Sequence, residues 1–152
     1  MKLDTLNYPD SWQIKPLASV VNYLKGRKPI ELTDFTTEGC QPYLTAAYLR
    51  SGKPSQFVSA SILDKCVLCN QSDPILIWDG SNAGDCFIGA LGVLASTMVR
   101  LVPDWQLLFN GYLYFLLRDQ FETLNKSTTG STIPHVNKNV FVNLSLPLPP
   151  LP

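Results

Sequence analysis

The sequence predicts an α+β fold, a single domain with a twisted, mainly antiparallel β-sheet packed by helices. Three observations lead to this prediction. Several short apolar segments are bounded by Gly, Pro, Asn or Asp, as strands usually are. Two longer segments carry apolar residues near helical spacing. The chain finishes in an extended apolar segment interrupted by prolines, which is typical of a strand at an edge.

The first elements are expected to be a strand and a helix. Residues 12–15 alternate between apolar and polar as a short strand does. Pro16 suits the first turn of a helix, because its missing N–H would be unpaired there anyway. We therefore predict a helix over residues 17–26 with an apolar stripe that includes Val20 and Leu24, ended by its glycine.

The next part of the chain, residues 29–61, reads as short extended pieces and loops. Residues 42–44 are a strand candidate, and residues 46–50 are long enough for about one helical turn. The Ser-Gly-Lys-Pro-Ser sequence at 51–55 predicts a turn.

The middle of the chain predicts a buried sheet. Residues 75–78 form a short, continuous apolar run rich in β-branched residues, which predicts a buried central strand. A glycine-containing loop at 79–85 ends it. Residues 86–89 and 92–102 predict further strands, in which glycines permit turns or bulges.

The last elements are a long helix, a short helix and a strand. Apolar residues near helical spacing predict a helix over residues 107–125. Gly130 then marks a tight turn, and Pro134 marks the start of a helix of one or two turns. Residues 144–152 predict the final strand, which stops at stacked prolines.

Length and composition favour one domain, residues 1–152, with its core at about 12–150. A chain of 152 residues with 45% hydrophobic content buries roughly two-thirds of its unfolded surface. The densest apolar stretch, residues 105–117, is well short of the roughly 20 residues that span a bilayer. The first residues lack the pattern of a signal peptide, so we expect a cytoplasmic protein and no membrane contact.

The four cysteines leave two interpretations open. Cys66 and Cys69 have the spacing of half a zinc site, and Cys40 and Cys86 could complete a tetrahedral thiolate set. A closed zinc site normally has a second short-spaced pair, which this sequence lacks. Free thiols in a reducing compartment are therefore favoured over a metal.

The distribution of charged residues along the chain is more informative than the net charge. Twelve basic and twelve acidic side chains cancel, so net charge gives no argument for nucleic acid. Acidic residues are nevertheless absent from residues 39–63 and from 123–152, and residues 25–28 add a cationic cluster. If the fold brings these segments to one face, they offer phosphates a positive surface; the alternative is ordinary solvated loops.

No segment predicts catalysis. The loop at 79–85 lacks the alternating ligands and closing Glu of a calcium loop and the Gly-Lys-Ser/Thr ending of a phosphate loop, which favours a simple glycine turn. His135 is the only histidine, and the acid-free tail gives no hint of a carboxylate to orient it. The sequence also lacks an Asp/Asn-Pro-Pro-Tyr/Phe motif of amino-methyltransferases.

The polar segment 126–132 fits two roles. It is either a flexible loop or a phosphate contact built from Lys126, hydroxyl groups and exposed N–H groups next to the expected helix start.

An ordered set of motifs runs over most of the chain, from Trp12, Leu17 and a Gly-x-x-Pro pattern at 26–29 to the end. It includes the strand and Gly-x-x-x-Gly turn at 75–84, the strand at 94–98, Thr-Gly-Ser-Thr-Ile-Pro at 129–134 and Leu-Pro-Leu-Pro-Pro-Leu-Pro at 146–152. This ordered set resembles the target-recognition domain of type I restriction-modification DNA specificity subunits.

The resemblance implies sequence-specific binding of one half of a split double-stranded DNA site. It implies a non-catalytic domain that directs a methyltransferase subunit and a restriction subunit, which use S-adenosylmethionine, ATP and Mg, while this chain itself holds no cofactor. The sequence stops at Pro152, where members usually continue into a spacer coiled-coil helix. We therefore expect a half-subunit or a truncated product, and a second specificity half-subunit is a further expected partner.

The family's base-reading positions vary, so chemistry selects the expected DNA contacts. For phosphates these are Lys25, Arg27, Lys28, Arg50, Lys53, Lys126 and Lys138, with Ser127 and Thr128 beside them. For base edges they are Arg50, Ser55, Gln56 and Asn82, because Arg suits guanine and Gln or Asn suits adenine in the major groove.

Two alternatives stay open. The first is an interaction fragment that assembles with such a complex without reading DNA itself. The second is a metal-dependent enzyme that uses the cysteines or the loop at 79–85.

Overall fold

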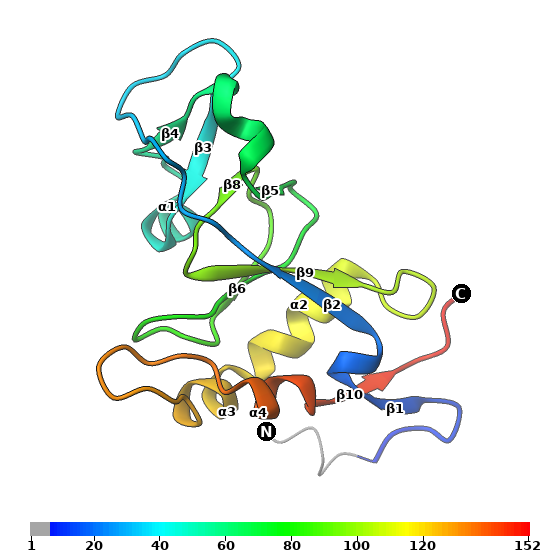
Figure 1. Ribbon diagram of the computed structural model, residues 1–152. Coiled ribbons are helices and arrows are strands. Elements are labelled where there is room, and N and C mark those ends of the chain that lie inside the picture. Colours follow the sequence, from blue (N-terminus) through cyan, green and yellow to red (C-terminus); the bar gives the residue numbers. More distant parts are fainter. Residues whose placement is uncertain (1–6) are drawn as a thin grey trace.

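A four-stranded antiparallel sheet runs through the middle of the molecule (Figure 1). The computed structural model describes residues 7–152. The strand order is β2-β9-β6-β7, with bounds Val21–Lys25, Met98–Pro103, Ile75–Ile77 and Cys86–Phe87. In the centre of this sheet, Leu76 lies opposite Val99.

A second four-stranded sheet forms the distal lobe at the top of Figure 1. Its order is β4-β3-β8-β5, with bounds Phe57–Val58, Gln41–Leu44, Gly92–Leu94 and Leu68–Cys69. The β3–β8 pairing is parallel, and every other pairing between named strands of residues 7–152 is antiparallel. A third sheet pairs β1 (Gln13–Pro16) with β10 (Ser145–Leu148).

The helices are short and lie mainly on one side of the central sheet. Their bounds are Ala46–Ser51 for α1, Asn110–Asp119 for α2, Phe121–Lys126 for α3 and Lys138–Val142 for α4, with 3-10 helices at Leu17–Ser19 and Ala60–Lys65. The Thr45 side chain caps the start of α1, and Gly52 ends it in the left-handed conformation.

Two hydrophobic clusters pack on opposite faces of the central sheet. Leu76 belongs to one cluster together with α2, α3, α4 and β10. Its neighbours Ile75 and Ile77 belong to the other cluster, which the distal sheet covers. Successive strand residues point to opposite faces, so a strand with both faces covered has to be continuously apolar. This explains the apolar run at 75–78 and confirms the predicted central strand.

The predicted α+β class and the mainly antiparallel pairing are confirmed, with the strands divided over three sheets rather than one. The strands near residues 12–15, 42–44, 86–89 and 144–152 and the helical turn near 46–50 are also present.

The prediction of a helix over residues 17–26 is wrong. The chain makes one 3-10 turn and then forms β2, where Val21 is buried, Asn22 is exposed and Tyr23 is half-buried. This alternation of burial has the period of a strand. Pairing along β9 supplies the backbone hydrogen bonds, and it outweighs the helix-start signal of Pro16.

Three other boundaries differ from the prediction. The predicted strand at 92–102 breaks into β8 and β9 at a turn around Ala95–Thr97, and the predicted helix at 107–125 breaks at Gln120 into α2 and α3. The helix predicted at Pro134 is wrong, because residue 135 forms bridges with Asp79 and Thr129. Helix α4 begins only after Asn137, whose side chain accepts hydrogen bonds from two backbone N–H groups.

Candidate nucleic-acid interface

The loop at residues 79–85, which joins β6 to β7, is the point where several distant segments meet. It is a tight loop in which Gly80 and Gly84 have positive φ angles of 109° and 97°. A Cβ atom on Gly84 would lie 2.7 Å from the Leu124 Cβ atom of α3. Glycine is therefore required both by the backbone conformation and by the close approach of α3.

Three side chains from other elements hold this loop. Lys25, at the end of β2, donates a hydrogen bond of 2.9 Å from Nζ to Asp79 Oδ2. Arg50 of α1 lies 3.7 Å from Asp85 Oδ2. Asn125 of α3 donates hydrogen bonds of 3.0 Å to the backbone oxygens of Ser81 and Ala83. Parts of all three acid-poor or cationic segments are thereby brought to one loop.

His135 also joins the loop, which corrects the expectation that it has no carboxylate partner. Its Nδ1 lies 2.6 Å from Asp79 Oδ1, and an ionised carboxylate only accepts, so the ring donates this bond. Burial raises the pKa of Asp79, but the hydrogen bonds from Lys25 and His135 outweigh it and hold the pKa below the ordinary 3.8. Asp79 is thus a stable anion between two donors.

Trp78, the residue before Asp79, anchors this cluster to the core. The Lys25 Nζ lies 5.8 Å from its ring centroid, a cation–π contact. The same ring stacks on Tyr23 with 5.5 Å between centroids and meets the edge of the buried Phe141 at 5.3 Å. The cluster is therefore fixed through rigid aromatic packing.

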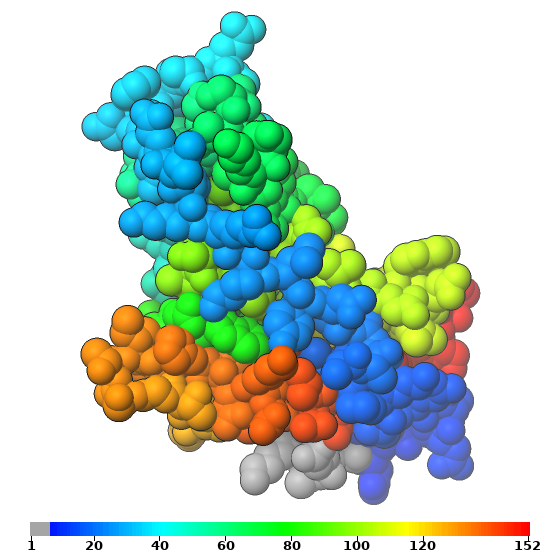
Figure 2. Space-filling model, viewed as in Figure 1, coloured from blue at the N-terminus to red at the C-terminus, as the bar shows by residue number. Residues whose placement is uncertain are grey.

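An open hollow of about 270 Å³, lined by both apolar and polar residues, lies beside the loop. Its polar lining comes from the loop at 79–82, from the strand and cap that precede α1, and from the turn before β9, as Tyr43, Thr45, Asp79, Ser81, Asn82 and Thr97. Figure 2 shows the left outline of the molecule indented between the distal lobe above and the orange residues around 127–134 below. The hollow therefore lies between hydroxyl and amide groups that can contact base edges or phosphates.

The structure brings some of the predicted DNA contacts to this region. Asn82 lines the hollow, and Lys25 and Arg50 pair with the two carboxylates of the loop. Lys126 follows Asn125 but pairs with Glu122 at 3.4 Å, and the Ser127 hydroxyl donates to Thr123 O at the end of α3. Thr128 is half-buried next to it.

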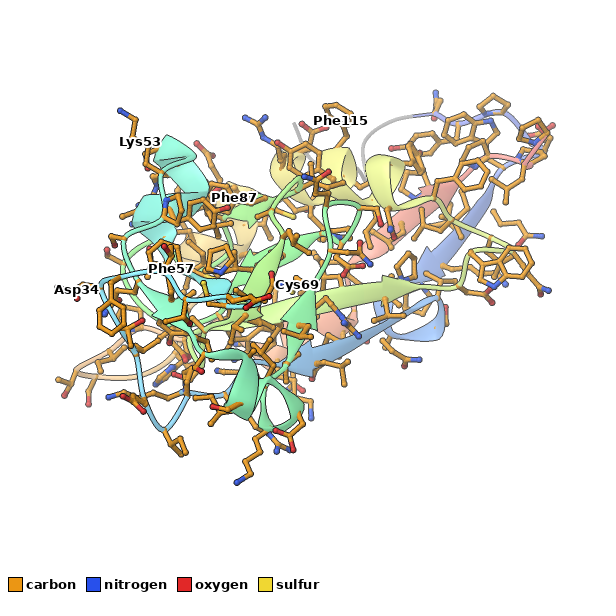
Figure 3. The ribbon with its side chains drawn as sticks, turned by 90° about the horizontal axis from the view of Figure 1, so that it is seen from above. Asp34, Lys53, Phe57, Cys69, Phe87 and Phe115 are labelled. Carbon is orange, nitrogen blue, oxygen red and sulfur yellow. The ribbon has the colours of Figure 1, made fainter. Side chains whose placement is uncertain are left out.

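Other predicted contacts lie farther along the surface. Arg27 and Lys28 are exposed where the chain leaves β2 for the distal lobe, and Lys138 is exposed at the start of α4. Lys53 and Ser55 are exposed beyond α1, and Figure 3 shows the Lys53 side chain pointing away from the molecule. Gln56 is half-buried, and its backbone oxygen accepts a hydrogen bond from Tyr43.

Gly26 explains how the cationic segment 25–28 reaches this region. A Cβ atom at this position would collide with the backbone oxygens of Ala95 and Leu94, and the Gly26 N–H donates 2.9 Å to Met98 O. The segment therefore lies directly against the turn that contributes Thr97 to the hollow.

The sequence interpretation missed His135, Tyr43, Thr45 and Thr97 at this site. The available signal was weak: His135 follows a turn in a hydroxyl-rich segment, but its partner Asp79 lies 56 residues away. Local patterns cannot reveal such a contact.

The cysteines do not form a site of their own. All four are free thiols, and among the described residues no group of three or more His, Cys, Asp or Glu side chains is arranged to hold a metal ion. Burial raises the pKa of Cys69 and of Cys86 to about 12, which makes both thiols poor nucleophiles. Within residues 7–152 the structure also contains no helix of the length and apolarity that a bilayer crossing requires.

Comparison with known proteins identifies relatives of the whole domain. The specificity subunit of the type I restriction enzyme MjaVIII from Methanocaldococcus jannaschii is 41% identical over 146 residues, which is 96% of this chain and 34% of that subunit. Among solved structures, a chain of a type I restriction-modification system studied for its assembly has a TM-score of 0.75 at 18% identity, covering 98% of this chain and 37% of its own.

The HsdS subunit from Thermoanaerobacter tengcongensis has a TM-score of 0.71 at 19% identity, covering 97% of this chain and 35% of its own. The chain therefore spans about a third of the length of these relatives. The family model described as the type I restriction modification DNA specificity domain matches residues 9–152. The chain belongs to this family of type I restriction-modification DNA specificity domains.

Proposed function

We propose that this chain is a non-catalytic DNA-recognition domain that reads one half of a split double-stranded site. The observation that carries the proposal is the convergence of Lys25, Arg50 and the end of α3 on the loop at 79–85, beside a hollow that is lined in part by hydroxyl and amide groups. Unpaired cations elsewhere on the surface attract the phosphates and set the register, while the amide and hydroxyl groups contact base edges.

The proposal divides the expected contacts into two groups. Four of the exposed cations without an ion pair in the described chain contact phosphates; these are Arg27, Lys28, Lys53 and Lys138. Asn82 and Arg50 face the bases from the hollow and its edge, with Ser55, Gln56, Ser127 and Thr128 contributing polar contacts. Lys25 and Lys126 act mainly through the carboxylates that they pair with.

The wider complex is part of the same proposal. A methyltransferase subunit and a restriction subunit supply the chemistry together with S-adenosylmethionine, ATP and Mg, and the complex works in the cytoplasm. The family assignment does not favour a fragment that assembles without reading DNA.

Selection from a pool of randomised DNA duplexes tests the proposal. We expect the chain to enrich one short motif, and the variant Asn82→Ala to relax the preference at one position of that motif. A matched control is Asn139→Ala, which changes an exposed Asn on α4. A chain unfolded in urea serves as the background for the selection. If the wild-type chain enriches no motif beyond this background, sequence-specific recognition is contradicted.

A further inference from the structure

The segment between Thr129 and His135 is a small hairpin with a rigid base. Thr129 and His135 exchange backbone hydrogen bonds of 2.9 and 2.7 Å. The Gly80 N–H donates 2.8 Å to Pro134 O, and the Val136 N–H donates 2.9 Å to Trp78 O. Together with the His135–Asp79 bond, these contacts fasten the hairpin to the loop at 79–85.

The turn of the hairpin is also fixed. Gly130 has a φ angle of 103°, and a Cβ atom there would meet the Ile133 backbone oxygen. Pro134 restricts the backbone on the other side. The hairpin therefore has little freedom to lose when it binds a ligand, which favours affinity.

The tip of this hairpin presents an apolar side chain among hydroxyl groups. Ser131 and Thr132 are exposed, and Ile133 is exposed to 55% although it is a large β-branched residue. Acidic residues are absent from 123–152, and the one carboxylate at the base of the hairpin, Asp79, is paired with Lys25 and His135. Phosphates can therefore approach the hairpin without meeting an unpaired negative charge nearby on this segment.

We infer that the hairpin tip enters the major groove and that Ile133 packs on the C5-methyl group of a thymine. This inference rests on the proposed function. The major groove admits a two-stranded β-ribbon, and apolar side chains recognise the thymine methyl there, while Ser and Thr hydroxyls bond to base or phosphate groups. The hairpin lies next to the hollow, so it places an exposed apolar side chain beside the hydroxyl and amide groups that line part of that hollow.

The test uses the duplex that the wild-type chain enriches from the random pool, and a series of copies in which one thymine at a time is replaced by deoxyuridine, which lacks the methyl group. We expect one replacement to weaken wild-type binding by about fourfold, the value of one buried methyl contact. The variant Ile133→Ala should bind both versions of that duplex equally, with the weaker affinity. Ile133→Leu, which keeps an apolar tip, should retain part of the discrimination.

Ile14→Ala is the matched control, because Ile14 is exposed to 53% on β1, away from the hairpin. It should behave as wild type in every binding measurement. Equal thermal unfolding temperatures of the two Ala variants would show that the hairpin variant is folded.

Several outcomes overturn the inference. If Ile133→Ala keeps the discrimination between thymine and deoxyuridine, Ile133 does not contact the methyl group, although DNA recognition stands. If no thymine position responds to deoxyuridine replacement in the wild type, no thymine methyl group is contacted in the major groove. If the wild-type chain enriches no motif, the proposed function fails together with this inference.

Discussion

Asp79 shows how much one residue can organise in a small domain. It follows the buried strand β6 and holds both Lys25 and His135, so it ties the end of β2 and the hairpin at 129–135 to the loop at 79–85. Its side chain is exposed to only 18%, which makes these bonds stronger than ordinary surface ion pairs.

The variant Asp79→Asn should be less stable than wild type by about 1–3 kcal/mol at neutral pH, because hydrogen bonds to a charged group are lost or weakened. The pKa of Asp79 is lowered in the folded state, so its stabilising contribution is complete above 3.8 and is lost as the pH falls through the folded-state pKa. Urea unfolding as a function of pH measures this, and the difference between the two proteins should shrink in that acid range.

Asp34→Asn is the control for this pH dependence. Asp34 is an exposed carboxylate in the loop between β2 and β3 and makes no ion pair in the described chain (Figure 3). Its replacement should leave the pH profile of stability unchanged. A difference of similar size in both variants would show that general charge, and not the Asp79 cluster, is responsible.

Gly26 is the second residue on which the site depends. Gly26→Ala should destabilise the protein by about 3 kcal/mol, because the new Cβ atom collides with the backbone of Leu94, at the end of β8, and of Ala95, in the turn that follows, and this backbone cannot yield easily. Gly111→Ala in α2 is a matched change, since a Cβ atom there meets nothing within 4 Å, and it should stabilise the helix by about 0.5–1 kcal/mol. Chemical denaturation measures the change in unfolding free energy for both variants, which should have opposite signs. A Gly26→Ala protein as stable as wild type would refute the close approach of Gly26 to Leu94 and Ala95.

At the scale of elements, the sequence predicts best where local pattern and tertiary environment agree. The apolar run at 75–78 is bounded by Pro74 and the glycine loop, and burial on both faces requires that composition. The helix prediction for residues 17–26 is wrong because local pattern and tertiary environment disagree there. Pro16 and Gly26 satisfy the local rules for a helix start and end, but the pairing of β2 with β9 joins Tyr23 to Leu101, and no local pattern encodes that partner.

In the candidate site, too, local patterns predict the separate segments but not the long-range contacts between them. The loop at 79–85 and the polar tail at 126–138 are recognisable separately as a glycine turn and a hydroxyl-rich segment. Their union depends on the Asp79–His135 contact, across 56 residues, and on the bonds from Asn125 to the loop. The helix predicted at Pro134 is displaced because Pro134 O and the His135 backbone are already used in pairing, so that α4 starts at the better cap, Asn137.

Helix α4 gives a prediction at this scale. Its five residues are too few to be stable alone, so the Asn137 cap and the burial of Phe141 have to hold it. Asn137→Ala should cost about 1 kcal/mol, because two backbone N–H groups lose their acceptor. Asn139→Ala, within the same helix, should be neutral or slightly stabilising in the same thermal or urea unfolding experiment. Equal effects of both changes would argue against a capping role.

At the scale of the whole molecule, two hydrophobic clusters on opposite faces of one sheet separate a helical base from a distal lobe. The hollow beside the 79–85 loop lies where these layers meet, at the ends of α1 and β6. Because the net charge is zero, attraction of DNA depends on where the positive side chains lie on the surface. The positive side chains of the helical base and of the distal lobe can contact one duplex only if they lie on the same face of the molecule.

Salt dependence tests this arrangement. Lys53→Gln and Lys138→Gln should each reduce the magnitude of the slope of log binding constant against log salt concentration by about 0.9, the value for one phosphate contact. Lys15→Gln is the comparison, because Lys15 lies on β1, away from the hollow. Fluorescence anisotropy with the enriched duplex gives the slopes. An equal slope for all three variants and wild type would place the duplex on another face.

The pairing of β1 with β10 has a consequence for how the chain is made. Gln13 lies opposite Leu148, so the first strand emerges from the ribosome roughly 130 residues before its partner. At typical translation rates the delay is on the order of ten seconds, during which the apolar surface that Leu146 and Leu148 later cover stays open to chaperones and to neighbouring nascent chains. Slow synthesis anywhere between β1 and β10 lengthens this exposure and is therefore expected to lower the yield of folded protein.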